Sequence, residues 1–136
     1  MEDGLTRTTP DKAKAGSILK MARTTLEMVK NIDERRFASN MVKEYYDIIR
    51  LLISAVLVLD GLKTYGEGAH KKAIEYLNRN FREFTEFDIT LINDLRITRN
   101  RISYNGFFVT EEFFSKRKGA IHQIIRKLEN IIEQKL

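Results

Sequence analysis

The segment RITRNRISYNG, residues 96–106, carries three arginines and no acidic residue. An arginine guanidinium binds phosphate through two parallel hydrogen bonds and offsets the charge that develops during phosphoryl transfer. Asn100 can hold a hydroxyl group or a phosphate oxygen, and Tyr104 can donate a hydrogen bond or stack on a base. The segment therefore predicts a phosphate-binding site. The alternative is an ordinary surface, because arginines near the C-terminus of a helix complement its dipole.

A helix over residues 85–105 must position these side chains. Thr85 and Asp88 have the spacing of a capping box, and Asn105-Gly106 is a typical helix end. The predicted buried stripe of this helix contains Phe84, Phe87, Leu91, Leu95 and Ile102. A second face begins with Ile89 and Ile92 and turns polar over the last two turns. We expect a cleft or another subunit to cover this face, and we predict a homodimer with Ile89 and Ile92 in its interface.

The rest of the chain predicts an all-α fold. From Asp11 onward apolar residues recur with a helical period, and no segment alternates with the period of a strand. Further helices are expected over about residues 34–60, after the glycine-rich connection 65–70, and after Thr110. We predict an up-and-down bundle of four main helices plus a short fifth helix. It forms a single domain over residues 11–136, preceded by a flexible tail over residues 1–10.

A polar stripe follows the otherwise apolar second helix. It contains Lys43, Asp47, Arg50 and Ser54 at helical spacing. One interpretation is a solvated edge of the helix. The other is that Asp47 or Glu44, together with Arg50, supports and orients an arginine of the helix over 85–105. His70 and His122 are isolated in the sequence, and we expect both to be structural or surface residues.

The composition narrows the classes of partner and chemistry. Lys plus Arg number 24 and Asp plus Glu 19, and the net charge of +5 favours polyanionic partners. The absence of cysteine excludes disulfides and thiol catalysis, and with two histidines we expect neither a metal nor another cofactor. The longest apolar run, residues 48–59, is too short to cross a bilayer, so we expect no membrane association. No signal-peptide pattern is visible, and we expect a cytoplasmic protein.

The chain resembles HEPN domains, especially the short stand-alone ones of archaea and bacteria. The matching segments are YYDIIRLLISAVLVLDGLKTYGEGAHKKAIEYL (45–77) and RNRISYNG (99–106). The family motif is an arginine, a polar residue, three further residues and a histidine. Arg99 and Asn100 match the first two positions, but Tyr104 stands where the family has histidine. The resemblance implies a helical fold, and it implies either metal-independent ribonuclease activity or partnership with a minimal nucleotidyltransferase.

Three functional hypotheses follow. The first is a HEPN-type protein that binds RNA or a nucleotide and has weakened catalysis, because a phenol, titrating near ~10, is a poor base at neutral pH. Arg99, Asn100 and Tyr104 would form its catalytic cleft. Binding residues would be Arg96, Arg101 and Ser103. The second hypothesis is an active metal-independent endoribonuclease toxin of a toxin–antitoxin pair. The third is a non-catalytic partner of a minimal nucleotidyltransferase.

Overall fold

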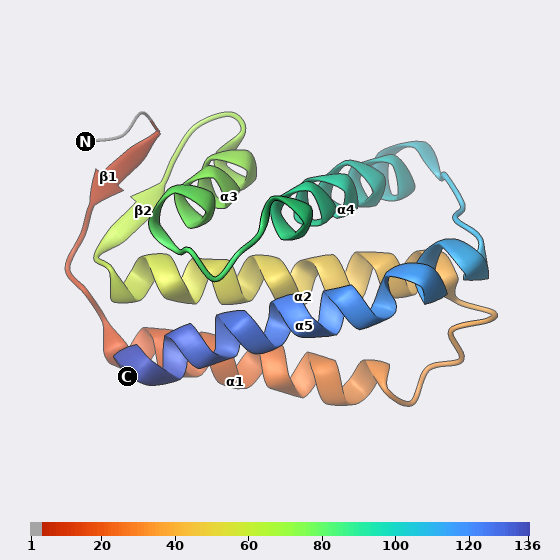
Figure 1. Ribbon diagram of the computed structural model, residues 1–136, viewed down its shortest axis with the longest axis horizontal. Coiled ribbons are helices and arrows are strands. Elements are labelled where there is room, and N and C mark those ends of the chain that lie inside the picture. The colour runs from red at the N-terminus through yellow and green to blue at the C-terminus, as the bar shows by residue number, and fades with distance from the viewer. Residues whose placement is uncertain (1–3) are drawn as a thin grey trace.

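The computed structural model describes residues 4–136 as a helical bundle with a small two-stranded sheet at one end (Figure 1). Its elements are β1 (Leu5–Arg7), α1 (Lys12–Val29), α2 (Ala38–Leu59), β2 (Leu62–Thr64), α3 (Ala69–Asn80), α4 (Glu86–Asn105) and α5 (Glu111–Lys135). Helices α1, α2, α4 and α5 run alternately up and down, and the shorter α3 lies in the connection between α2 and α4 (Figure 1). The predicted all-α bundle of four main helices and a short fifth is confirmed.

Helix α2 lies at the centre of the bundle and contacts each of the other four helices. Its sequence is apolar almost all round, as expected of a helix covered on most sides. Its large fully buried side chains include Tyr45, Ile48, Ile49 and Leu52. A side chain on α2 can therefore reach a neighbouring helix in nearly any direction, and this property positions the candidate site.

The ends of the helices follow the capping signals in the sequence. The Asp11 side chain accepts a hydrogen bond of 2.9 Å from the backbone N–H of Lys14 at the start of α1. Thr85 and Asp88 form a reciprocal capping box at the start of α4. Gly61 and Gly106 follow α2 and α4 with φ values of 68° and 62°, a backbone region that favours glycine. The predicted boundaries at these positions are confirmed.

The prediction of a flexible tail over residues 1–10 is wrong for β1. Residues Leu5–Arg7 pair antiparallel with β2, and Leu5 is 4% exposed in a small cluster with Leu57 and Tyr76. The backbone N–H of Thr8 donates a 2.9 Å hydrogen bond to the carbonyl of Gly61. Strands of three residues are too short to show an alternating pattern, so the sequence did not reveal them. Residues 1–3 of the predicted tail lie outside the described residues.

The two predicted faces of α4 are corrected at particular residues. Phe87, placed in the buried stripe, is 66% exposed, whereas Leu91 and Leu95 are buried as predicted. Ile92 is 0% exposed and belongs to the main core, and Ile89 is partly buried against that core. The chain itself covers Ile92, so the expectation that Ile92 needs a second subunit is wrong. The physical reason is that α4 packs against α2 on a broader face than the stripe implied.

Among residues 4–136, no helix combines the length and the apolar character that a membrane span requires.

Candidate phosphate-binding site

Asp47 on α2 connects its own helix to α4. Its Oδ1 atom lies 3.7 Å from Nε of Arg50, one turn along α2, and 3.8 Å from Nε of Arg99 on α4. All three side chains are partly exposed, Arg99 the least at 24%. Both distances exceed those of a hydrogen bond, so the attraction is mainly electrostatic. One carboxylate is thus shared by two guanidinium groups.

Several polar atoms here are buried without a hydrogen-bond partner among the described residues. They are Oδ1 of Asp47, Nε of Arg99 and Nε of Arg96. Buried polar atoms in folded proteins are nearly always bonded, and leaving one unbonded costs about 1–3 kcal/mol. These Nε atoms have almost no accessible surface, so an anionic ligand would be bound through the terminal nitrogen atoms of the two partly exposed arginines.

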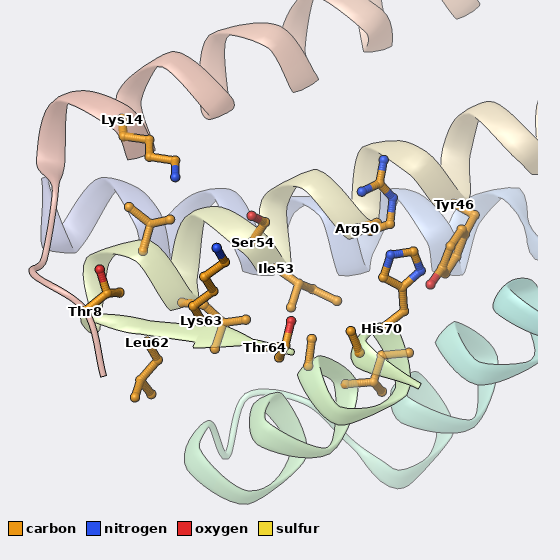
Figure 2. A pocket seen from close by; sticks show the side chains of 15 residues that line it. Thr8, Lys14, Tyr46, Arg50, Ile53, Ser54, Leu62, Lys63, Thr64 and His70 are labelled. Carbon is orange, nitrogen blue, oxygen red and sulfur yellow. The ribbon is translucent and has the colours of Figure 1, made fainter. Parts of the chain in front are cut away.

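Tyr46 and His70 complete this group of side chains, which we call the Asp47 cluster: Tyr46, Asp47, Arg50, His70, Arg96 and Arg99. The rings of Tyr46 and His70 have centroids 6.5 Å apart, and His70 lies beside Arg50 and Tyr46 (Figure 2). Partial burial lowers the pKa of His70, and the charges of Arg50 and Arg99 lower it further. The imidazole is therefore neutral at neutral pH and can accept a proton or a hydrogen bond.

Burial raises the pKa of the Tyr46 hydroxyl, and the positive charges of Arg96, Arg50 and Arg99 oppose that shift. Tyr46 therefore remains a neutral hydrogen-bond donor beside the cluster's cations. A protonated hydroxyl and a neutral imidazole facing several guanidinium groups can together bind a phosphate group from more than one side.

The other predicted site residues lie in the last turns of α4. Tyr104 is 76% exposed, and a spacing of five residues separates it from Arg99 by about 140° around the helix. Arg101 is exposed, with its guanidinium carbon 3.9 Å from the centroid of the Phe107 ring. Ser103 is exposed and Asn100 is partly buried. Within one chain Tyr104 therefore lies on another side of α4 than Arg99, whereas Asn100 is one turn from both Arg96 and Tyr104.

Of the supporting residues predicted on α2, some belong to the Asp47 cluster and one does not. Asp47 and Arg50 belong to the cluster, as the interpretation of a supporting carboxylate requires. Glu44 is partly buried but forms no ion pair with an arginine of residues 4–136. The polar stripe of α2 is thus a contact between helices over part of its length.

The sequence analysis missed His70 as a member of the site. Gly66 and Gly68 have φ values of 80° and 71°, and α3 begins directly after them, so that His70 lies in its first turn. The two glycines allow the chain to turn back over α2 at Tyr46. The glycine-rich segment YGEGAH was the available signal, but nothing in it connects His70 to a residue 24 positions earlier.

A second group of titratable side chains lies where α2 faces α5. The Tyr45 hydroxyl is 3.3 Å from Nε2 of His122, and Nζ of Lys118 donates to Oε1 of Glu34 at 2.9 Å. A cavity of about 280 Å³ adjoins these residues. Burial and the charge of Lys118 lower the pKa of His122. In the part of the chain that the structure describes, no three His, Asp or Glu side chains gather closely enough to hold a metal ion.

No protein-family model, no curated protein and no solved structure matches this chain. The resemblance to HEPN domains therefore remains a prediction from the two sequence segments that carry it.

Proposed function

We propose that this chain is a cytoplasmic HEPN-type protein that binds RNA or a nucleotide through phosphate and has weakened catalytic activity. The observation that carries the proposal is the Asp47 cluster, where Arg50 and Arg99 share the carboxylate of Asp47 and Arg96 adds a third positive charge near Tyr46. Like charges gathered around one acid repel each other, and a phosphate group would relieve that repulsion. Arg96 and Arg99 are both partly exposed, which leaves their charge available to a phosphate group.

The exposed residues at the end of α4 extend this binding surface. Arg101 and Ser103 are exposed there and can contact further phosphates. Tyr104, with 76% of its surface exposed, offers a ring on which an unpaired base can stack. Tyrosine at the family's histidine position is the reason for proposing weakened cleavage, since a phenol does not take up a proton at neutral pH.

The test is binding of single-stranded RNA of mixed sequence, in EDTA, at about 50 mM and about 200 mM salt. Arg99→Ala should weaken binding about ten- to hundredfold and reduce the salt dependence by about one phosphate contact. Arg126→Ala is the matched control, because Arg126 is exposed on α5 outside the cluster. Binding that does not change with salt, or that Arg99→Ala and Arg126→Ala reduce equally, would contradict the proposal.

The second candidate function is the active metal-independent endoribonuclease, and the position of His70 favours it. A neutral imidazole beside arginines can take the proton of an RNA 2′-hydroxyl. The 2′-oxygen then attacks phosphorus and the bond to the 5′-oxygen breaks. The products are a 2′,3′-cyclic phosphate and a 5′-hydroxyl, which receives its proton from the imidazolium.

This candidate predicts that His70→Ala lowers RNA cleavage in EDTA at least about a hundredfold while RNA binding persists. Because the pKa of His70 is lowered, the neutral base remains available below the ordinary histidine pKa, and cleavage should persist below pH ~6.5. His122→Ala, beside Tyr45 where α2 meets α5, is the control. Cleavage that survives His70→Ala would exclude His70 as the base.

A further inference from the structure

A cavity of about 400 Å³ lies beside the Asp47 cluster, between α2, β2 and the first turns of α3 (Figure 2). This volume lies within the range of small-molecule sites in proteins. Among residues 4–136, no side chain of α4 lines it. Tyr46, Arg50 and His70 of the Asp47 cluster line the cavity, whereas Arg96 and Arg99 do not, so the cavity adjoins the site proposed for RNA and shares these three side chains with it.

The walls of the cavity are chemically divided. Seven aliphatic residues form the apolar part: Ile53, Leu57, Val58, Leu62, Ala69, Ala73 and Ile74. The cationic part consists of Lys14, Arg50 and Lys63, whose nitrogen atoms lie on one side of the view in Figure 2 with Ile53 and Leu62 on the other. Ser54 and Thr64 add two hydroxyl groups to the lining. An amphipathic ligand matches such a division.

The charge of the cavity wall has one sign. None of the lining residues of the described chain is an aspartate or a glutamate. Neither Lys14 nor Lys63 forms an ion pair with a residue of the described chain, and Arg50 has only the 3.7 Å contact with Asp47. Three cations around a partly apolar cavity favour an anion and disfavour a neutral or cationic ligand.

We propose that this cavity binds a small organic phosphate monoester with an aromatic or aliphatic body. A phosphate monoester carries a charge of about −1.5 to −2 and three acceptor oxygens, which suits three cations and two hydroxyl groups better than a carboxylate does. The body of the ligand lies against Ile53, Leu57 and Leu62. The start of α3 adds to the attraction, because Ala69 and His70 line the cavity and no side chain caps that helix.

Calorimetric titration of the whole chain tests both parts of the site. The probes are 1-naphthyl phosphate, inorganic phosphate as the head alone and 1-naphthol as the body alone. The ester should bind at least about tenfold more tightly than either fragment. Inorganic phosphate binding as tightly as the ester would overturn the proposal. Titration with adenosine 5′-monophosphate tests whether the ester is a nucleotide. Binding of 1-naphthyl phosphate but not of adenosine 5′-monophosphate would indicate a ligand that is not a nucleotide.

Variants locate the binding. Ala73→Leu should fill the cavity and weaken ester binding at least about tenfold, and Ser54→Leu fills it from α2 if the first variant does not fold. Lys63→Ala should weaken binding about ten- to hundredfold, whereas Lys71→Ala, exposed on α3 outside the cavity, should have no effect. Unchanged ester affinity in a folded Ala73→Leu or Ser54→Leu variant would overturn the proposal.

Ester binding in the cavity does not depend on RNA binding, and the variants Arg99→Ala and Lys63→Ala can distinguish the two. RNA affinity is tested with Arg99→Ala, which lies outside the cavity wall. If the wild-type chain proves not to bind RNA, it should still bind the ester, and Lys63→Ala should still weaken that binding. Conversely, absence of ester binding with normal RNA binding would overturn the cavity proposal alone.

Discussion

Arg99 occupies the side of α4 that is apolar two turns earlier. It follows Ile92 by seven residues, which places both on nearly the same side of the helix. Ile92 is completely buried in the core, and Arg99 continues that face to where it meets Asp47 of α2. An arginine in such a place is only 24% exposed, so its charge is less screened than that of a surface arginine. This position distinguishes Arg99 from Arg101, which is exposed.

Tyr104 stands where the HEPN motif that this segment resembles has a histidine, and this difference gives a prediction at the residue scale. If the proposed weak catalysis reflects a missing base, Tyr104→His should raise RNA cleavage in EDTA about a hundredfold. Because Tyr104 is 76% exposed, the substitution should not change the thermal stability of the fold.

The measurement is the rate of cleavage at neutral pH, with Tyr104→Phe as the control that removes only the hydroxyl. No gain in a folded Tyr104→His protein, together with slow wild-type cleavage, would contradict the proposal that position 104 limits catalysis. A parallel assay of His70→Ala separates the two candidate functions, since only the second assigns the base to α3.

At the scale of elements, strand β1 is a structural part of the fold. Leu5 is 4% exposed and packs with Leu57 and Tyr76, and Tyr76 in turn donates a 2.6 Å hydrogen bond to Asp60. Leu5→Ala should lower the free energy of unfolding by about 2–3 kcal/mol, because it removes buried methyl groups and leaves a cavity. Urea denaturation measures this loss. Thr6→Ala, at an exposed position of the same strand, should cost far less.

The helix boundaries were predictable because their signals are local. The Thr85 capping box and Gly106 lie within a few residues of the ends they determine, and the structure contains both. The side of α4 that faces the core was less predictable, as the exposed Phe87 and the buried Ile92 show. Apolar side chains occur on several sides of this helix, and which side is buried depends on the neighbours that pack there.

The candidate site was predictable where a single helix carried the information. Asp47 and Arg99 were identified from helical spacing, and the structure brings them to 3.8 Å. His70 was not identified, because its proximity to Tyr46 depends on how the chain turns at Gly66 and Gly68. The cavity was not predicted for the same reason, since its walls come from residues between Thr8 and Ile74.

At the scale of the whole molecule, the predicted homodimer needs a different surface from the one first proposed. Ile92 is completely buried by its own chain, so Ile92→Glu would unfold the protein and could not report on association. Ile97 is 50% exposed, so its own chain does not cover the side of α4 on which it lies. We expect this side to form the interface.

The prediction is that the wild type sediments as a dimer and that Ile97→Glu sediments as a folded monomer, because burying a carboxylate in an apolar interface is unfavourable. Met21→Glu, at another exposed apolar position on α1, is the control and should remain dimeric. A monomeric wild type would contradict the dimer, and a dimeric Ile97→Glu would contradict this choice of surface.

The two histidines give the molecule a predicted pH dependence of stability. Burial lowers the pKa of both His70 and His122, and nearby Arg and Lys side chains lower it further. The unfolded chain therefore binds protons at a higher pH than the folded one. Their contribution to stability is present above pH ~6.5 and is lost as the pH falls from there through the lower pKa of the folded state.

Urea denaturation at about pH 7.5 and about pH 5.5 measures this effect, and the protein should be less stable at the lower pH. Replacing both histidines by glutamine should reduce the difference between the two conditions. Equal or greater stability of the wild type at the lower pH would show that the two imidazoles are not held neutral by the fold.

Helix α3 has fewer buried side chains than any other helix of the bundle, and this has a consequence for local opening. Its 12 residues include three buried side chains, whereas α2 includes thirteen. Segments with few buried contacts open at a lower free energy than the core, so the backbone amides of α3 should exchange with deuterium well before those of α2. His70 and part of the cavity wall belong to α3. Each opening of α3 therefore moves the His70 imidazole away from Arg50, and each closing returns it. A ligand that bridges α2 and α3 would slow this exchange, and the protection of α3 amides would record its binding.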